Sequence, residues 1–381
     1  MAAAGERVAV VLGGGGARGA YEAGALSVLL PELERRGQRP ALFVGTSAGA
    51  LNTALLAATA HLPAAEVAEL ATAIWSELRY GQVLEPLVSP GSIGRVLGYL
   101  GEALGVPRAH LWSVLDPSPL TITLPERVDF AQLRRNVADG VVHAAAVVAT
   151  SARTARSVVF HQGGEPSTPR DDRRGIDYLA VKLRADHVLA SAAIPVLFPA
   201  VEIAGEWYSD GGTRLNTPVK PALELGADRI VAVAVNALAP ADFHGRPDAL
   251  VSGGGVLQAL LADQLLHDVR TLEMVNAMVA DAGRPLAGRR AIPHVLVTPE
   301  RPDTIGTVAR DVFERHYGAL RDAVHDPDLV AVGRALAGDS DAAHGEILSY
   351  LFFAPEFARA LLALGRADAE TALERDAFWR T

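Results

Sequence analysis

The chain has 381 residues, of which 50% are apolar and none is cysteine. It is long enough for one large domain or two modest ones with a sizeable core, and the lack of cysteine excludes disulfides and thiolate metal sites. A formal net charge of −9 argues against nucleic acid as a partner and against membrane attachment through a polybasic patch, because both need clustered Lys and Arg.

The first predicted element is a strand from Val8 to Leu12, a β-branched apolar run that fits a strand buried on both faces. The stretch before it, Met1 to Arg7, is too short for a signal-peptide core. No later run reaches membrane-spanning length without a charge. We therefore expect a cytoplasmic protein that can associate peripherally with membranes.

Seven residues rich in glycine follow this strand, Gly-Gly-Gly-Gly-Ala-Arg-Gly at positions 13–19. The spacing of Gly14, Gly16 and Gly19 fits the dinucleotide-binding fingerprint. That interpretation also needs an acidic residue at the end of the next strand, and the predicted strand from Ala41 to Val44 leads into Gly-Thr-Ser instead. The lysine of a Walker loop is missing as well, so phosphate binding loses its support.

An oxyanion hole is the alternative function for this loop. The consecutive amides of Gly14, Gly15 and Gly16, with Ala17 and Arg18 following, can point into one concavity that no side chain blocks. Three roles are open for Arg18. It orients the loop, it contacts an anionic head group, or it is a solvated residue at the start of a helix.

The next strand ends in a turn that carries Ser47. Residues 45–49 read Gly-Thr-Ser-Ala-Gly, the Gly-x-Ser-x-Gly nucleophile elbow in the strand–turn–helix context that it requires. Gly45 and Gly49 avoid a Cβ where the turn is tight, and the turn sets the Ser47 hydroxyl at the positive end of the following helix. The alternative is an incidental serine in a glycine-rich turn.

The rest of the chain alternates helices with strands, as an α/β protein does. We predict helices at Ala20–Leu30 (ended by Pro31), Ala50–Ala60, Ala64–Leu78, Phe130–Ala138, Ala185–Ala193 and Val219–Leu225, and strands at Val141–Ala149, Ser157–His161, Val201–Ile203, Trp207–Tyr208, Ile230–Val235 and Ala291–Val297. Residues 86–119 read as an insertion that covers the sheet, and 163–175 as an exposed loop of mixed charge. A long helix is expected at 256–282. An apolar helix at 345–364 is expected to pack on the core.

Asp210 is the candidate base for Ser47. It follows a short strand and precedes two glycines, although an ordinary Asp-Gly turn is the commonest meaning of that pattern. A serine needs a neighbouring base, and none of the later histidines lies in a recognisable strand-end turn. We therefore favour a dyad in which the Asp210 carboxylate takes the Ser47 proton directly, with desolvation raising the pKa of the carboxyl group.

Three motifs in this order resemble the patatin-like phospholipase family: the glycine loop at 13–19, Gly-Thr-Ser-Ala-Gly at 45–49 and Asp-Gly-Gly at 210–212. The segments 190–195 and 215–218 are similar to it as well. The resemblance covers about residues 6–236. It departs from the family at Val196, where we expect a glycine, and it fades from about residue 240.

The resemblance implies a three-layer α/β/α fold with a mostly parallel central sheet. It implies a catalytic domain at 6–236, and a mainly helical C-terminal region at 237–381 that completes or packs on the core. Ser47 would be the nucleophile, Asp210 the base and residues 14–18 the oxyanion loop, with no metal or cofactor.

The implied activity is a serine esterase of the phospholipase A or lysophospholipase type, which hydrolyses fatty acyl esters. Its partners would be a lipid or lysophospholipid substrate and, transiently, a membrane surface. Two alternatives are an acyl-transferase that uses the same site and a non-catalytic lipid- or nucleotide-binding module. The sequence leaves a homodimer open.

Overall fold

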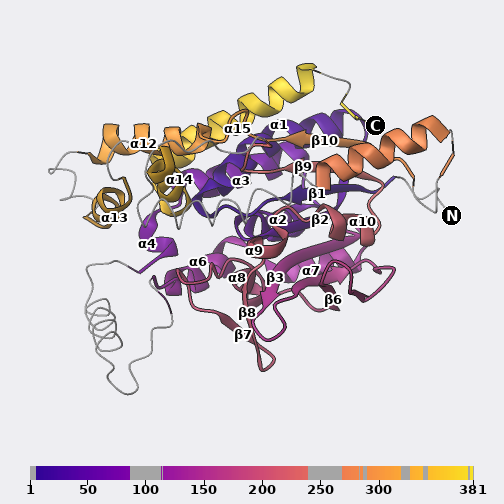
Figure 1. The fold of residues 1–381 in the computed structure, drawn as a ribbon, viewed down its shortest axis with the longest axis horizontal. Coiled ribbons are helices and arrows are strands. Elements are labelled where there is room, and N and C mark those ends of the chain that lie inside the picture. The colour runs from indigo at the N-terminus through magenta and orange to yellow at the C-terminus, as the bar shows by residue number, and fades with distance from the viewer. Residues whose placement is uncertain are drawn as a thin grey trace.

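A computed structural model describes residues 6–85, 113, 115–238, 268–282, 284–285, 290–318, 327–337, 342–375 and 378–380 (Figure 1). Most of the predicted insertion at 86–119 lies outside the described residues. So does the first part of the helix predicted at 256–282, of which residues 268–282 are described and helical.

A single ten-stranded sheet forms the centre of the fold. Its strands are β1 Val8–Leu12, β2 Pro40–Thr46, β3 Ala144–Ser151, β4 Ser157–Gly163, β5 Arg170–Asp171, β6 Ile176–Ala180, β7 Val201–Ile203, β8 Glu206–Asp210, β9 Arg229–Val233 and β10 His294–Val297. The order is β10-β9-β1-β2-β3-β4-β6-β5, with β8 on β3 and β7 on β8. Strands β10, β9, β1, β2 and β3 are parallel, whereas β4 and β8 run antiparallel to β3.

The register explains how distant segments meet. The pairing of β2 with β3 ends at Thr46 and Val148. The pairing of β8 with β3 begins at the next residue of β3, where Ala149 pairs with Asp210. Because β4 occupies the other edge of β3 at Ala149, β8 continues the edge that β2 has left. The end of β8 is therefore brought beside the turn that follows β2.

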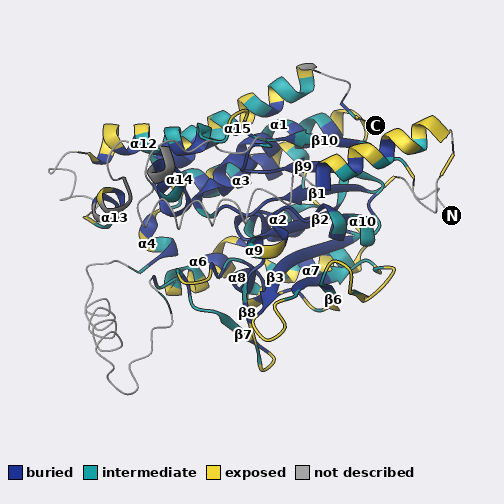
Figure 2. Ribbon diagram, in the orientation of Figure 1, coloured by how far each residue is buried: buried dark blue, intermediate teal, exposed yellow. Residues whose placement is uncertain are grey.

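Helices cover both faces of this sheet. They are α1 Gly19–Arg35, α2 Ala48–Thr59, α3 Ala64–Glu77, α4 Tyr80–Val83, α6 Ser118–Arg127, α7 Phe130–Ala138, α8 Ala185–Ser191, α9 Gly212–Leu215, α10 Val219–Glu224, α12 Thr304–Tyr317, α13 Pro327–Ala337, α14 Ala342–Leu351 and α15 Pro355–Arg375. Side chains of α1, α2, α3 and α15 pack on one face, and those of α10 and of residues 268–282 pack on the other. This is the predicted three-layer α/β/α architecture, with a buried sheet at its centre (Figure 2).

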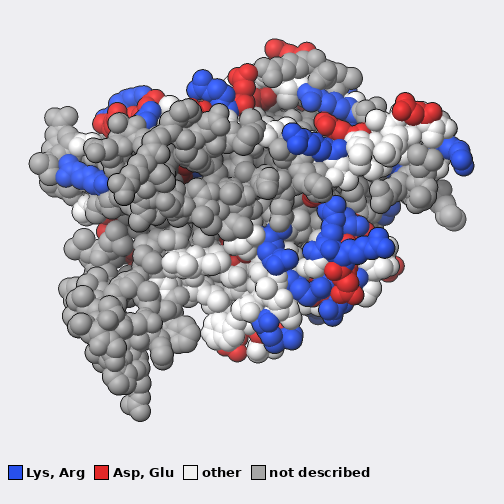
Figure 3. Space-filling model, in the orientation of Figure 1, with Lys and Arg blue, Asp and Glu red and all other residues white. Residues whose placement is uncertain are grey.

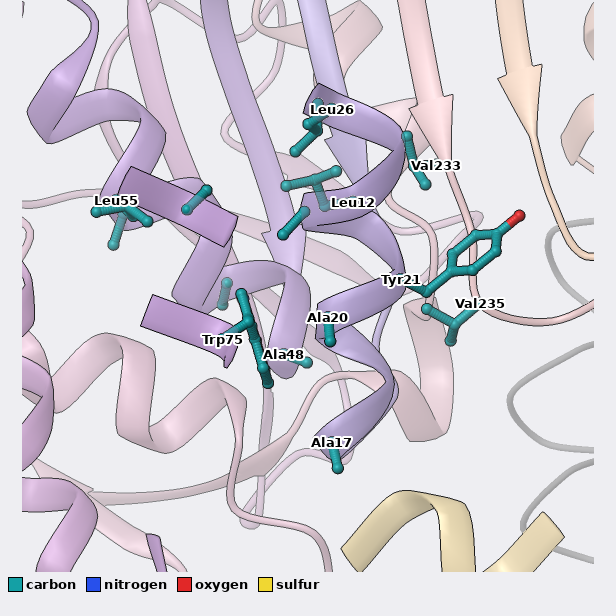
Figure 4. Packing of buried hydrophobic residues seen from close by; sticks show 14 of the residues in the cluster. Leu12, Ala17, Ala20, Tyr21, Leu26, Ala48, Leu55, Trp75, Val233 and Val235 are labelled. Atoms are coloured by element: carbon teal, nitrogen blue, oxygen red, sulfur yellow. The ribbon is translucent and has the colours of Figure 1, made fainter. Parts of the chain in front are cut away.

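The strand β1 shows why these residues form a central strand. Val8, Val10 and Leu12 join the core on one face, and Ala9 and Val11 join the core on the other. All five are fully buried, as expected of a strand in the middle of a parallel sheet. Figure 4 shows Leu12 among residues of the first core, beside Leu26 and Val233.

Two predicted boundaries at prolines were wrong. Helix α1 continues through Pro31 to Arg35, because Leu29, Leu30 and Leu33 on either side of it are buried and tertiary packing offsets the hydrogen bond that proline removes. The helix predicted at 345–364 is instead two helices. Leu351 ends α14 and Pro355 begins α15, where proline disfavours helical geometry at the preceding residue.

The predicted loop at 163–175 contains the short strand β5, which pairs with β6. Its charges are largely paired. Arg170 lies 2.7 Å from Asp172, and Arg174 lies 2.9 Å from Asp268. Basic and acidic side chains lie next to one another in this part of the surface (Figure 3).

The C-terminal helices α14 and α15 belong to the same hydrophobic core as α1. A Cβ placed on Gly24 would lie 2.2 Å from the carbonyl oxygen of Leu362, and one on Gly365 would lie 2.0 Å from that of Tyr21. Helices α1 and α15 therefore approach one another at backbone contact. In the described part of the chain, no single helix has the length and apolar character needed to cross a membrane.

We expect Gly24→Ala to lower the free energy of unfolding by about 1–3 kcal/mol, because the new methyl group overlaps the α15 backbone. Gly81→Ala is the matched control, since Gly81 is also helical but exposed, with nothing within 4 Å of the added Cβ. Helix propensity alone predicts that both changes stabilise the protein by up to ~1 kcal/mol. Denaturant unfolding of both variants separates the two effects. Equal shifts for both would contradict the close contact of α1 with α15.

Candidate active site

The turn after β2 holds Ser47 in an unusual backbone conformation. Its φ is 54° and its ψ is −120°, a region that costs an L-residue energy and persists only where the surroundings enforce it. A Cβ on Gly45 would lie 2.1 Å from the carbonyl oxygen of Gly49, and one on Gly49 would lie 2.6 Å from that of Gly13. Both glycines are therefore required by the tightness of the turn.

Asp210, at the end of β8, contacts the Ser47 hydroxyl. Both residues line one cavity, each is only 4% exposed, and the Ser47 hydroxyl lies close enough to the carboxyl group to favour its ionised form. The amide of Gly212 donates a hydrogen bond of 2.6 Å to Asp210 Oδ1. Burial raises the pKa of Asp210 to about 6, although the Ser47 hydroxyl and the Gly212 amide act in the opposite direction.

The end of α8 fixes the backbone of both residues. The amide of Ser47 donates to Ser191 Oγ at 2.9 Å, and this hydroxyl donates in turn to the carbonyl of Val148 at 2.5 Å. The amide of Asp210 donates to the carbonyl of Ala193 at 2.8 Å. No role was predicted from the sequence for Ser191, which lies in the segment 190–195 that resembles the family. Its sole local signal was a polar residue among alanines.

Only part of the predicted oxyanion loop is available to a ligand. The amide of Gly14 already donates to the backbone carbonyl of Asn216 at 3.2 Å and to its side-chain oxygen at 3.0 Å. In the described part of the chain, the amides of Gly15 and Gly16 have no such partner. Gly15 and Gly16 line a cavity with Ser47, whereas Ala17 is buried away from it. Two amides, not three, therefore remain available to a ligand.

Arg18 is neither a solvated residue nor a contact for a head group. It is 1% exposed and makes an ion pair with Glu346 of α14. Its guanidinium also donates to Ser349 Oγ at 2.8 Å and to Asn236 Oδ1 at 3.1 Å, and it lies 3.9 Å from the centre of the Tyr350 ring. Of the three roles that the sequence left open, the structure supports the first, in which Arg18 orients the loop.

The pKa of Arg18 reflects this environment. Burial alone would lower the pKa, but the charge of Glu346, followed by Tyr350 and the hydrogen bond to Glu346, outweighs it and raises the value. Arg18 therefore remains a cation inside the protein. Its charge is compensated by one carboxylate, as a buried ion requires.

Two cavities meet at Ser47. The smaller has a volume of about 20 Å³, and its lining includes Asp210, Thr213 and Tyr350. The larger has a volume of about 370 Å³ and is lined mainly by apolar side chains, with Ser47 and Gly16 on its wall. Ser47 thus lies on the wall of both a small space beside Asp210 and a large, mainly apolar space.

Val196 lies at the rim of this site. Its φ is +73°, its side chain is 75% exposed, and Pro195 before it lines the smaller cavity. A β-branched residue is rare in the left-handed region, where glycine is favoured. The departure from the expected glycine therefore coincides with a strained backbone position.

The described residues offer no other base for Ser47. No histidine lines either cavity in these parts of the chain. Nor do the described residues bring together three or more His, Cys, Asp or Glu side chains in a group that could hold a metal ion. Asp210 is therefore the titratable neighbour of the Ser47 hydroxyl.

The geometry defines a class of protein, an α/β protein with a serine on a strained strand–helix turn beside a buried carboxyl group. The model of the patatin-like phospholipase family matches residues 10–223, more than half of the chain. The chain belongs to the patatin-like phospholipase family. This membership supports lipid hydrolase activity in general.

Similar solved structures are more distant. VipD from Legionella pneumophila is 14% identical with a TM-score of 0.38, over 98% of this chain and 67% of that one. Human GIVD cytosolic phospholipase A2 is 13% identical with a TM-score of 0.42, over 97% of this chain and 61% of that one. The chain thus spans about three fifths to two thirds of the length of these proteins. No curated protein sequence matches it.

Removing Arg18 should destabilise the protein strongly. Arg18→Ala leaves the buried Glu346 carboxylate unpaired, and we expect the free energy of unfolding to fall by about 3–5 kcal/mol. Arg35→Ala is the control, because Arg35 pairs with Glu32 at the surface and the loss should stay below about 1 kcal/mol. Denaturant unfolding measures both variants.

Combining Arg18→Met with Glu346→Met tests whether the loss of stability comes from the unpaired Glu346 carboxylate. The double variant should regain much of the stability lost in Arg18→Ala, since neither charge is then buried alone. A loss in Arg18→Ala no larger than in Arg35→Ala would contradict the buried ion pair between Arg18 and Glu346.

Proposed function

We propose that this protein is a metal-independent serine hydrolase that cleaves fatty acyl esters of phospholipids or lysophospholipids through Ser47 and Asp210. The observation that carries the proposal is that these two buried side chains line the same cavity, within the residues that match the family. The strained φ of Ser47 supports it, because such strain is concentrated at functional sites.

In the first half of the reaction, Ser47 is acylated. The Asp210 carboxylate accepts the Ser47 proton while Oγ attacks the acyl carbon of the ester. The amides of Gly15 and Gly16 hold the negative charge on the carbonyl oxygen. As the bond to the alcohol breaks, the proton passes from Asp210 to the leaving oxygen. A pKa near 6 suits both steps at neutral pH.

The larger cavity accounts for the substrate class. Its volume of about 370 Å³ lies within the range of small-molecule sites, and Leu51, Leu189, Phe198 and Phe353 give it an apolar wall. We assign it to the fatty acyl chain. The alcohol part of the ester then faces Asp210 and the smaller cavity. Transient contact with a lipid surface supplies the substrate.

Loss of either side chain should abolish activity. Ser47→Ala removes the nucleophile and Asp210→Asn removes the base, and each should lower kcat/KM about 10³-fold or more. Nitrophenyl esters and phosphatidylcholine vesicles are the substrates. Ser27→Ala is the matched control, because Ser27 lies on α1, lines neither cavity, and bonds to the Gly24 carbonyl and to Arg366. Full activity in either site variant would refute the dyad.

The same assays distinguish the alternatives. An acyl-transferase would pass the acyl group to added glycerol or lysolipid in preference to water. A lipid-binding module would show no turnover and no covalent labelling of Ser47 by a fluorophosphonate.

Asp210 should also set the pH dependence. Activity needs the carboxylate, so kcat/KM should rise with pH through a midpoint near 6. The folded pKa is raised above the ordinary value, so the proton favours the folded state and stability is lost as pH rises through 6. Asp210→Asn should therefore raise the free energy of unfolding at pH 8, by up to about 3 kcal/mol, and leave it unchanged at pH 4. Equal effects at both pH values would contradict the buried carboxylate.

A further inference from the structure

The turn formed by residues 195–197 presents an apolar tip beside the proposed acyl site. Both ends of the turn are fixed, because Ile194 and Phe198 are buried and the amide of Phe198 donates to the carbonyl of Ile194 at 2.8 Å. The tip itself, Pro195 and Val196, is exposed. The protein therefore holds two apolar residues in the solvent on a well-anchored turn.

Val196 is unfavourable at this tip for two reasons. Its φ of +73° lies in the left-handed region, which a β-branched residue rarely adopts. Its side chain is also 75% exposed, so packing within the chain does little to offset the strain. Strained residues persist mainly at functional sites, where they contribute to another interaction. The conformation and the exposure of Val196 together point to a contact outside the chain.

The same segment lines both cavities at Ser47. Ile194 and Pro195 line the smaller cavity, and Ile194, Phe198 and Pro199 line the larger one, to which we assign the acyl chain. The inner side of the segment thus borders the ester site, while Val196 projects from its outer side. A ligand that contacts Val196 is therefore within a few residues of the place where the ester binds.

The chemistry of this segment favours the apolar part of a lipid. Residues 188–201 contain no charged side chain, and Ser191, their one polar side chain, is buried. Residues 199–201 are partly exposed and continue the apolar surface beyond the turn. In the described part of the chain no Lys or Arg lines either cavity, and the larger one has Asp116 and Asp186 on its wall. An anionic lipid surface finds no concentrated positive charge here.

We infer that the turn at residues 195–197 is a lipid-contact surface, and that Val196 inserts into the apolar layer of a zwitterionic lipid surface. The inference rests on the proposed function and names the surface through which the substrate is reached. Burial of the valine side chain among acyl chains is favourable, and this gain is absent while the protein is free in water. Because the contact is apolar, it requires no basic side chains.

Val196→Asn is the test, because asparagine tolerates the left-handed region and replaces an apolar side chain by a polar one. Binding is measured by sedimentation with vesicles of an ether-linked phosphatidylcholine, which has no acyl ester, so that binding is separated from turnover. We expect the partition coefficient to be about tenfold lower in the variant, as the lost burial of one valine side chain predicts. Wild-type binding should be equal at about 0.1 M and about 1 M NaCl.

Activity and stability distinguish lost lipid contact from a damaged site. Val196→Asn should hydrolyse a soluble short-chain nitrophenyl ester as the wild type does, while hydrolysis of vesicles of ordinary phosphatidylcholine falls about tenfold. Its denaturant midpoint should be no lower than that of the wild type, because the substitution relieves backbone strain.

Val141→Asn is the matched control. Val141 is also an exposed valine, but it precedes β3 at the end opposite to Asp210 and lines neither cavity. This variant should change neither vesicle binding nor vesicle hydrolysis.

Three results would overturn the inference while the proposed function stands. The first is absent wild-type binding, or equal binding of wild type and Val196→Asn. The second is binding that requires phosphatidylglycerol and is lost in high salt, which would indicate an electrostatic contact elsewhere. The third is a wild-type dimer that Val196→Asn dissociates, which would make the turn a contact between two copies of the chain.

Failure of the proposed function looks different. In that case the wild type would hydrolyse neither the nitrophenyl ester nor the phosphatidylcholine vesicles. Binding to the ether-linked vesicles, and its dependence on Val196, would still be measured independently of turnover.

Discussion

The contact between the Ser47 hydroxyl and the buried Asp210 carboxyl group is the constraint on which the rest of the structure depends. It exists because β2 and β8 share one edge of β3, with Asp210 one pair beyond the end of β2. Burial gives Asp210 a raised pKa, and the turn gives Ser47 a strained φ. Both features cost stability, and the surrounding sheet and helices offset them. A site of this kind needs support from many parts of the chain.

Much of that support comes from the C-terminal helices. Arg18 links the glycine loop to Glu346 and Ser349 of α14, more than 300 residues away in sequence. Helix α15 lies along α1 at backbone contact through Gly24 and Gly365. The glycine loop is thus held between the sheet on one side and α14 on the other. The C-terminal region contributes to the site as well as to the core, since Tyr350 lines the small cavity.

Local sequence patterns predicted the helices and strands, but not the contacts between residues that are distant in the sequence. The runs at β1 and β2, the glycines around Ser47 and the Asp-Gly-Gly turn indicated the strands, the elbow and the dyad, because each depends on neighbouring residues. Two predictions at prolines were wrong. Pro31 lies inside α1, because packing of the neighbouring leucines stabilises the helix there. Pro355 begins a new helix within a segment that was predicted as one continuous helix. The contacts of Arg18 with Glu346 and of the Gly14 amide with Asn216 could not be predicted from one sequence. In each pair the two residues are far apart in the chain, and only the tertiary fold brings them together.

The central claim is that Asp210 activates Ser47 directly, and the rate of covalent labelling tests it without reference to any particular lipid. A fluorophosphonate should modify the wild type at a single residue, identified as Ser47 by peptide mapping, and the rate should follow a carboxylate titrating near pH 6. In Asp210→Asn the labelling should be at least about 10²-fold slower at pH 8 and should not follow this titration. Labelling at another serine, or an unchanged rate in Asp210→Asn, would contradict the account.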